Sequence, residues 1–131
     1  MRVLALDHGS ARCGCAVSDP SGTLATPLDA VDRPDTRKGL ARIAALADDL
    51  DAERVVVGLP LTLAGDEGAQ AAEAREFAEK LQRRVRVPVD LYDERLTTRM
   101  AEATGGKADP DSVAAAHLLE SYLTAQGAGD R

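Results

Sequence analysis

The spacing of hydrophobic residues changes period along the chain, and these changes mark out strands and helices. Residues 2–7 form a continuous apolar run that ends in Asp7, a pattern typical of a central strand covered on both faces. Short strands are predicted over 13–18 and 23–26, and the Pro and Gly between them indicate a tight turn. We therefore expect these three strands to form an antiparallel meander.

After the meander, the apolar residues recur at intervals of three and four. This spacing predicts amphipathic helices over 36–51 and 68–84. A buried strand is predicted over 55–57, between the two helices, and a further strand over 85–92, after the second one. Pro88 has no N–H to donate to a neighbouring strand, so it indicates that this last strand lies at an edge of the sheet.

The C-terminal helix has the clearest boundaries in the sequence. Asp109 is expected to be its N-cap, Pro110 its first residue, and Gly127 the residue just past its end. The resulting order, βββαβαβα, predicts an α/β fold with a mixed five-stranded sheet and helices packed on its faces. The chain of 131 residues fits one domain, expected over 1–126, with 127–131 as a frayed tail.

Composition and charge constrain the function. Hydrophobic residues make up 44% of the chain but aromatic ones only 2%, so Val, Leu, Ile and Ala must fill most of the core. The net charge of −6 argues against a simple basic nucleic-acid-binding protein, because phosphate binders are usually positive. A nucleic-acid function therefore needs local positive charge or a metal. Basic residues do cluster, although a solvated surface is the simpler interpretation for most of them; the clusters are Arg33, Arg37, Lys38 and Arg42, then Arg83, Arg84 and Arg86, then Arg95 and Arg99.

The sequence carries no signal-peptide pattern and no apolar run near the ~20 residues that span a bilayer. We therefore expect a cytoplasmic protein that does not enter a membrane. Cys13 and Cys15 lie two residues apart on one predicted strand face, which is a poor spacing for a disulfide and supplies only half of a tetrahedral metal site. They are expected to be buried free thiols.

Acidic residues stand at three places where chemistry is expected. Asp7 ends the central strand, where a carboxylate needs hydrogen-bond donors or a cation, although a turn-forming Asp is an equal alternative. Of Asp93 and Glu94, which end the edge strand, only one can point the same way as Asp7. Asp111 begins the apolar stripe of the last helix and is expected to face the sheet. The alternative is a first-turn Asp favoured by the helix dipole.

Carboxylates gathered without His or Cys make a hard, oxygen-only site, which suits Mg²⁺ or Mn²⁺ better than Zn²⁺. Two such ions would activate a water, bridge a scissile phosphate and stabilise the leaving oxygen. A metal pair would also explain how an acidic protein handles a polyanion. Catalysis by a Ser or Cys nucleophile is poorly supported, since His8 and His117 are the only histidines and His117 is interpreted as a helix-face residue.

Four short motifs follow one another over nearly the whole chain. They are Leu6-Asp7-His8-Gly9-Ser10 with Gly14 and Val17, Val57-Gly58-Leu59-Pro60-Leu61 with Gly65, Asp93-Glu94-Arg95-Leu96-Thr97, and Asp111 ahead of Ala114-Ala115 and Leu119-Glu120-Ser121-Tyr122. Each motif alone is weak, but the ordered set is highly specific. In these motifs the chain resembles the YqgF (RuvX-like) family, whose members are described as Holliday junction resolvases and as pre-16S rRNA nucleases.

The resemblance implies an RNase H-like fold with catalytic, metal-binding carboxylates at Asp7, Glu94 and Asp111, and so selects Glu94 rather than Asp93. It also implies substrate-binding roles for six further residues, with Gly9, Ser10, Gly58 and Pro60 shaping the cleft and Arg95 and Thr97 orienting the Asp-Glu-Arg segment. Two features depart from the family pattern. His8 stands where an apolar or aromatic residue is expected, and the segment 100–110 is short, which affects substrate reach.

The implied function is a nuclease that hydrolyses phosphodiester bonds. Its leading substrate is the 5′ end of pre-16S rRNA, with ribosomal particles as a partner, and a branched four-way DNA junction is the alternative. A catalytically silent RNA-binding module is a different class, against which the presence of all three carboxylates argues. A third interpretation compares Asp-x-Gly and Ser10 with the phosphate loop of sugar kinases and heat-shock-protein ATPases. Those proteins need two such lobes, and this chain supplies one.

Overall fold

The computed structural model describes residues 1–61, 64–93 and 110–129, and within the last range the side chains of residues 112–126. Its strands and helices follow the predicted order with one addition, a short fourth strand. In chain order they are β1 (Val3–His8), β2 (Arg12–Ser18), β3 (Ala25–Pro27), β4 (Val31–Asp32), α1 (Arg37–Asp49), β5 (Arg54–Leu59), α2 (Ala69–Gln82), β6 (Val89–Asp93) and α3 (Pro110–Gly129).

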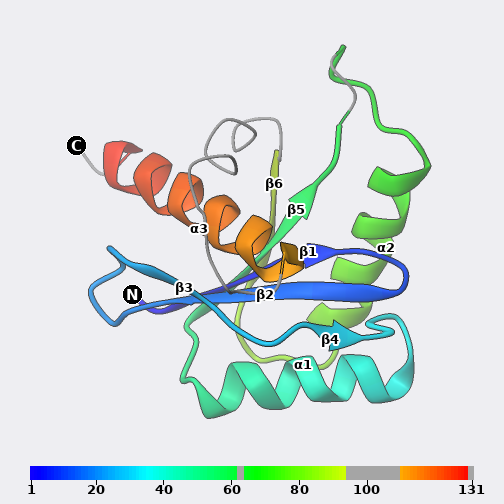
Figure 1. Ribbon diagram of the computed structural model, residues 1–131, viewed down its shortest axis with the longest axis horizontal. Helices are drawn as coiled ribbons and strands as arrows, with labels where there is room; N and C mark the ends of the chain where they lie inside the picture. The colour runs from blue at the N-terminus through cyan, green and yellow to red at the C-terminus, as the bar shows by residue number, and fades with distance from the viewer. Residues whose placement is uncertain (62–63, 94–109, 130–131) are drawn as a thin grey trace.

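The sheet has the strand order β3-β2-β1-β5-β6, and the two-residue β4 also pairs with β2 (Figure 1). β1 runs antiparallel to β2 and parallel to β5, which in turn runs parallel to β6. The mixed sheet, the antiparallel meander and the edge position of the last strand are all confirmed. β1 has strand neighbours on both sides, which accounts for its continuous apolar run.

β4 is the one described strand that the sequence does not predict. Val31 and Asp32 pair with Cys13 and Arg12, so the sheet has six strands instead of the predicted five. A strand of two residues is too short to show an alternating pattern, and only the partner strand defines its position. β4 covers the beginning of β2 and ties the segment before α1 to the β1–β2 hairpin.

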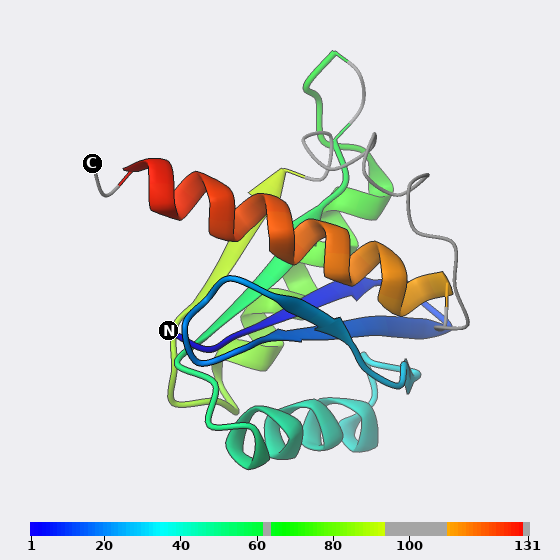
Figure 2. The same cartoon turned by 60° about the vertical axis from the view of Figure 1, so that its left-hand side comes forward.

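Helices cover both faces of the sheet, with α1 and α2 on one face and α3 on the other (Figure 2). The side chains of β1 alternate between the two faces. Leu4 and Leu6 lie in the core under α1 and α2, whereas Val3 and Ala5 lie in the core under α3. The α/β architecture is therefore as predicted. No helix in the described ranges is long and apolar enough to cross a bilayer.

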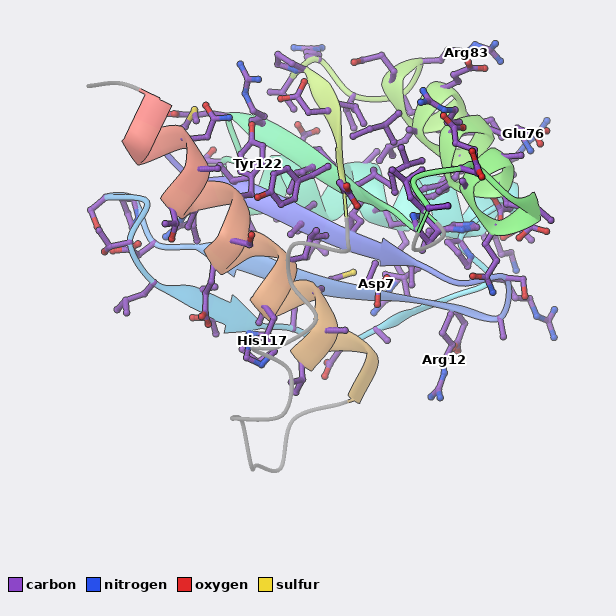
Figure 3. The ribbon with its side chains drawn as sticks, turned by 90° about the horizontal axis from the view of Figure 1, so that it is seen from above. Asp7, Arg12, Glu76, Arg83, His117 and Tyr122 are labelled. Carbon is purple, nitrogen blue, oxygen red and sulfur yellow. The ribbon has the colours of Figure 1, made fainter. Side chains whose placement is uncertain are left out.

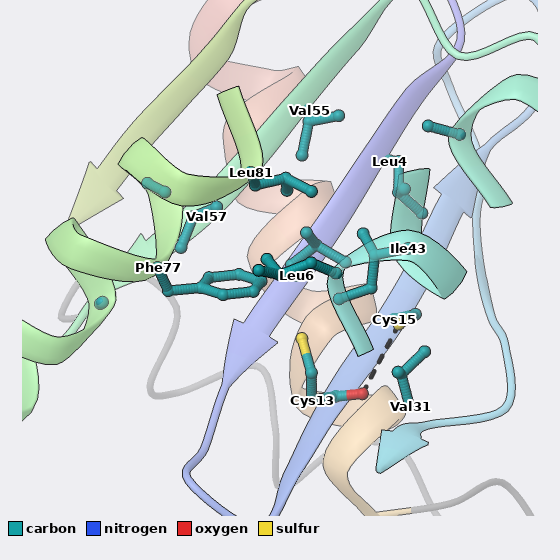
Figure 4. Close-up of a cluster of buried hydrophobic side chains, with 14 of the residues drawn as sticks. Leu4, Leu6, Cys13, Cys15, Val31, Ile43, Val55, Val57, Phe77 and Leu81 are labelled. Atoms are coloured by element: carbon teal, nitrogen blue, oxygen red, sulfur yellow. Dashed lines mark hydrogen bonds between the residues drawn. The ribbon is translucent and has the colours of Figure 1, made fainter. Parts of the chain in front are cut away.

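The core under α1 and α2 is built from aliphatic side chains around the ring of Phe77 (Figure 4). Cys13 and Cys15 are buried in it as thiols and form no disulfide, as predicted. The Cys15 thiol donates to the Cys13 carbonyl oxygen at 3.5 Å. Hydrogen bonding with the Cys15 side chain, together with burial, raises the pKa of the Cys13 thiol well above its ordinary value. Cys13 therefore stays protonated at neutral pH and is unsuited to be a nucleophile.

Two element boundaries differ from the prediction by three or more residues. α3 starts at Pro110 as expected but continues to Gly129, so the predicted stop before Gly127 is wrong. A glycine ends a helix by taking a left-handed conformation, whereas Gly127 lies within the helix. β6 begins at Val89 rather than at residue 85; Pro88, just before it, has no N–H to donate, and only its carbonyl oxygen bonds to β5, accepting from the Val55 N–H at 2.9 Å. The predicted N-cap, Asp109, lies outside the described residues.

A close backbone contact fixes the start of α1. The Thr36 hydroxyl caps the helix by accepting from the Gly39 N–H at 3.1 Å, and it donates to the Arg33 carbonyl oxygen at 2.7 Å. A Cβ atom at Gly39 would lie only 2.2 Å from that same carbonyl oxygen. The turn before α1 therefore admits no side chain at this position.

Gly39→Ala is expected to lower the free energy of unfolding by at least about 2 kcal/mol, because the backbone must move to admit a methyl group. Gly68→Ala is the matched control, since a Cβ atom at Gly68 would meet nothing within 4 Å. Its cost, as an exchange at a helix N-cap, is expected to stay below about 1 kcal/mol. Urea denaturation of both variants measures the difference, and equal losses would contradict the tight packing of Gly39.

Candidate active site

Asp7 lies near the C-terminal end of β1, on the face of the sheet that α3 covers. Its side chain follows Val3 and Ala5 in the alternation of the strand, and both of these pack under α3. Asp7 is half-buried, at the arrow end of β1 in Figure 3. The first of the predicted carboxylates therefore faces the helix that carries the third.

Glycines stand on both sides of Asp7 in the sheet. Its partner on β2 is Gly14. On β5, Gly58 follows the last residue paired with β1 and so comes level with Asp7. The alternation of β2 and β5 directs both glycine positions to the α3 face. No neighbouring side chain of the sheet stands beside the carboxylate, which leaves space for an ion or a phosphate backbone to approach it.

The N-terminal turn of α3 is fastened to β2 next to Asp7. Ser112 is fully buried in this turn, and its hydroxyl oxygen accepts from the Cys15 N–H at 3.2 Å. Because Cys15 follows Gly14, the strand partner of Asp7, this bond holds the first turn of the helix over the candidate site. Asp111 directly precedes Ser112, so its backbone belongs to this turn. The side chain of Asp111 lies outside the described residues.

The sequence did not reveal the role of Ser112. A serine in the first turn of a helix usually bonds to its own helix or to water, and no periodicity identifies a different partner. The partner here is a backbone amide 97 positions earlier in the chain. Only the packing of α3 across β2 brings the two groups together.

Side chains of β5 and β6 hold the other half of α3. The Tyr122 hydroxyl donates to the Asp90 carboxylate at 3.0 Å, and Arg54 forms an ion pair with the same carboxylate. The hydroxyls of Tyr92 and Ser121 lie 2.9 Å apart and share a hydrogen bond. Burial, followed by the contact with Asp90, raises the pKa of Tyr122, so its hydroxyl remains a donor at neutral pH. α3 is thus fixed at two points along its length.

The end of β6 separates the two adjacent acids. Asp93 pairs with Leu59, whose side chain lies in the core under α1 and α2, so Asp93 is directed away from the face of Asp7. Glu94, the predicted ligand, lies outside the described residues, as do Arg95 and Thr97. Their roles stay predictions.

His8 turns to the opposite face from Asp7. Its ring stacks on Phe77 with centroids 4.6 Å apart, and its Nε2 atom lies 2.8 Å from the Asp35 carboxylate. The flat imidazole therefore fills the position where the family pattern has an apolar or aromatic residue. Together with the two buried thiols, His8 places nitrogen and sulfur donors on the face that Asp7 does not share.

The β1–β2 hairpin carries two further predicted residues. A Cβ atom at Gly9 would lie 2.7 Å from the Arg12 carbonyl oxygen, so the turn itself requires glycine there. Ser10 is exposed at the tip. Pro60, just beyond the end of β5, is half-buried. Substrate contacts by these three residues stay predictions, and Gly9 already has a sufficient structural reason.

The part of the chain that the structure describes contains no group of three or more His, Cys, Asp or Glu side chains that could hold a metal ion. Of the three predicted carboxylates, only Asp7 has a described side chain. The structure thus brings together Asp7 and the backbone turn of Asp111.

Comparison with known proteins identifies the family. The model of the family described as "RuvX: Holliday junction resolvase" matches residues 1–125, from β1 through most of α3. This chain belongs to the RuvX family. The resemblance inferred from the four motifs is therefore confirmed.

Bacterial relatives of this RuvX protein carry the name "Putative pre-16S rRNA nuclease". The protein from Syntrophomonas wolfei is 38% identical over 132 residues, which cover 94% of this chain and 94% of that protein. The protein from Mycobacterium tuberculosis is 47% identical over 132 residues, covering 93% of this chain and 78% of that protein. These alignments span nearly the full length of this chain and at least 78% of each relative, so the similarity is not confined to one motif.

Solved structures with a similar fold include nucleases and kinases. The structure "T. thermophilus RuvC in complex with Holliday junction substrate" matches with a TM-score of 0.67 and 16% identity, over 97% of this chain and 96% of that one. A ROK hexokinase from Thermus thermophilus matches with a TM-score of 0.50 and 20% identity, over 82% of this chain but 39% of the kinase. These likenesses establish the RNase H-like fold that the sequence predicted.

Ser112→Ala in this RuvX protein is expected to lower the free energy of unfolding by about 1–3 kcal/mol, because the buried Cys15 N–H loses its acceptor. Amide hydrogen exchange at Cys15 should become faster. Thr124→Ala is the control, since Thr124 is exposed and its hydroxyl bonds to the Glu120 carbonyl within the same helix. Its effect should stay within about 0.5 kcal/mol. An unchanged exchange rate at Cys15 would show that α3 is not fastened at this point.

Proposed function

We propose that this RuvX protein is a metal-dependent nuclease that hydrolyses phosphodiester bonds. The observation that carries the proposal is the position of Asp7, level with two glycines on the sheet face over which Ser112 fastens the first turn of α3. This arrangement places the half-buried carboxylate between two strand positions that carry no side chain. The names of the relatives, which cover nearly the whole chain, support the same activity.

The proposed catalytic residues are Asp7, Glu94 and Asp111. Asp111 belongs to the helical turn held beside Asp7. Glu94 is proposed in place of its neighbour Asp93 because Asp93 points to the face opposite Asp7. Gly9, Ser10, Gly58, Pro60, Arg95 and Thr97 are proposed to border the substrate.

The donor set fits Mg²⁺ or Mn²⁺, because it consists of three carboxylates, and His8 and the two thiols lie on the opposite face. Two such ions, when bound, supply an activated water and stabilise the charge on the leaving oxygen. The chain contributes the three carboxylates that hold the ions and the fixed distance between β1 and α3. A bound metal pair also offsets the repulsion between an acidic protein and a polyanion.

The 5′ end of pre-16S rRNA is the substrate that we propose, with a ribosomal particle in the cytoplasm supplying part of the positioning. Trimming a precursor needs one active site and one strand. In the described part of the chain, the exposed large hydrophobic residues are Met1 and Leu24, which are too few to anchor an apolar dimer interface. A protein that works as a single copy suits precursor trimming.

Resolution of a four-way DNA junction is the alternative. The family description and the RuvC complex with a junction favour it. Junction resolution requires paired, symmetric incisions, which a two-fold dimer provides by holding two sites in a fixed relation. The oligomeric state in solution therefore separates the two substrates.

Asp7→Asn, Glu94→Gln and Asp111→Asn are each expected to reduce cleavage at least ~100-fold, because the loss of one ligand weakens the metal on which both nucleophile and leaving group depend. Cleavage of labelled RNA in Mg²⁺ or Mn²⁺ measures the loss, and chelation of the metal should abolish the activity of the unaltered protein. Near-normal activity in any of the three variants would remove that residue from the site.

Asp93→Asn is the matched control for Glu94→Gln, since the two residues are neighbours in sequence and the Asp93 side chain is directed away from the face of Asp7. It should cost less than about 5-fold in rate, because a residue away from the metal contributes little to the transition state. Comparable losses in the two variants would contradict the choice of Glu94.

Single-stranded or locally unpaired precursor RNA is expected to be cut faster than an intact four-way DNA junction by the same preparation. Kinetics on both substrates, together with the mass in solution from sedimentation, test this order. A stable dimer that makes symmetric junction cuts faster than it trims RNA would favour the alternative function.

A further inference from the structure

A pocket of about 1060 Å³ opens between the tip of the β1–β2 hairpin, β4 and the start of α1. Its lining includes a single carboxylate, Asp32, and five cationic side chains. We call these five residues the basic hollow: Arg12, Arg33, Arg37, Lys38 and Arg42. The lining is therefore strongly positive, although the chain as a whole has a net charge of −6.

Most of the cations in the basic hollow are not neutralised by the described part of the protein. Within the described residues, four of them form no ion pair, namely Arg33, Arg37, Lys38 and Arg42. Elsewhere on the described surface, by contrast, Arg54, Arg75 and Lys80 each contact a carboxylate. All five side chains of the hollow are exposed. Their charge is therefore available to an anion from outside.

Two of these cations occupy positions that a helix disfavours. Arg37 and Lys38 are the first two residues of α1, and the first turn of this helix contains no acidic residue. The N-terminus of a helix carries partial positive charge, so cations there weaken the helix, whereas carboxylates would strengthen it. Stability of α1 thus gives no reason for these two residues, and a binding role does.

The basic hollow is built on a fixed frame. Arg12 pairs with Asp32 in the sheet, and the Arg33 N–H donates to the Ala11 carbonyl oxygen at 2.8 Å. The Arg33 carbonyl oxygen in turn accepts from the Thr36 backbone and hydroxyl. Three segments of the chain are therefore bonded to one another beneath the cationic side chains.

The hollow also lies at the same end of the sheet as Asp7. The hairpin that carries Arg12 directly follows β1, and Figure 2 shows the beginnings of α1 and α3 at one end of the molecule with this hairpin between them. In Figure 3, Arg12 extends outward from the β1–β2 hairpin at the lower edge of the view, whereas Arg83 lies at the opposite, upper edge. A strand that passes Asp7 can therefore continue over the hairpin to the start of α1.

We infer that the basic hollow binds the phosphodiester backbone of a nucleic-acid strand at a distance from the bond that is cut at Asp7. This inference rests on the proposed nuclease function. Contacts to phosphates are independent of base sequence, so RNA and single-stranded DNA should both bind there. Phosphate contacts of this kind also provide affinity that base stacking cannot, because the chain has few aromatic side chains.

The test measures binding of the full chain to fluorescent 20-nucleotide RNA and single-stranded DNA in EDTA, over a range of salt concentrations. The triple variant that combines Arg37→Gln, Lys38→Gln and Arg42→Gln should weaken binding of both strands at least about 10-fold. The slope of the logarithm of the binding constant against the logarithm of the salt concentration should become shallower by about 2, since each lost phosphate contact removes about 0.7 from that slope for a single strand. Lys38→Gln alone should remove about a third of that slope change. Melting temperatures of these variants should be unchanged or higher, because cations leave the helix N-terminus.

The control combines Arg83→Gln, Arg84→Gln and Arg86→Gln, which removes the same charge after the end of α2, away from the hollow. This control measures the general effect of removing three positive charges, which should change the affinity less than about 2-fold.

Equal losses of affinity in the two triple variants, or no loss in the first, would overturn the inference. So would competition by polyglutamate as strong as that by RNA, which would indicate an acidic protein as the ligand. Because EDTA prevents cleavage, these results are independent of the nuclease assay, and loss of the proposed activity alone would leave binding by the hollow measurable.

Discussion

The burial of β1 on both faces is the constraint on which the rest of the molecule depends. Its side chains alternate between two cores. A shift of one residue in the pairing register of β1 would therefore move every side chain to the opposite face of the sheet, including those of Asp7 and His8. The carboxylate would then face the ring of Phe77, where an unpaired charge costs several kcal/mol, and the imidazole would move under α3. The packing that stabilises the fold therefore also fixes the direction of the candidate catalytic carboxylate.

Directional hydrogen bonds, and not apolar contacts alone, position α3 over the candidate site. The core between this helix and the sheet combines small side chains such as Ala5 and Ala16 with larger ones such as Leu119, and apolar contacts of this kind are not directional. The bond from the Cys15 N–H to the Ser112 hydroxyl is directional and buried, and so defines where the first turn lies. The position of Asp111, the proposed metal ligand in this turn, thus depends on a polar contact made by its neighbour.

Charge is distributed unevenly over this acidic chain. Ion pairs neutralise several cations, including Arg54 against Asp90 and Arg75 against Glu67, and the latter contact lowers the pKa of Glu67. The cations near the start of α1 have no such partners in the described part of the chain. A negative net charge is therefore compatible with a local positive surface, because an approaching strand responds to the nearest charges within about 10 Å at ordinary salt.

The sequence by itself determined the order of elements, the interior position of β1, the edge position of β6 and the family, because hydrophobic period, proline placement and ordered motifs are local properties. Strand alternation also predicted that only one of Asp93 and Glu94 can share the face of Asp7, and Asp93 is directed to the other face. Only the tertiary structure decided that Ser112 fastens α3 to β2, that β4 exists, and that the basic side chains near α1 share one pocket. Each of these features depends on groups that are distant in sequence and come into contact only in the folded chain. Hydrophobic periodicity is a local property of the sequence and does not predict such contacts.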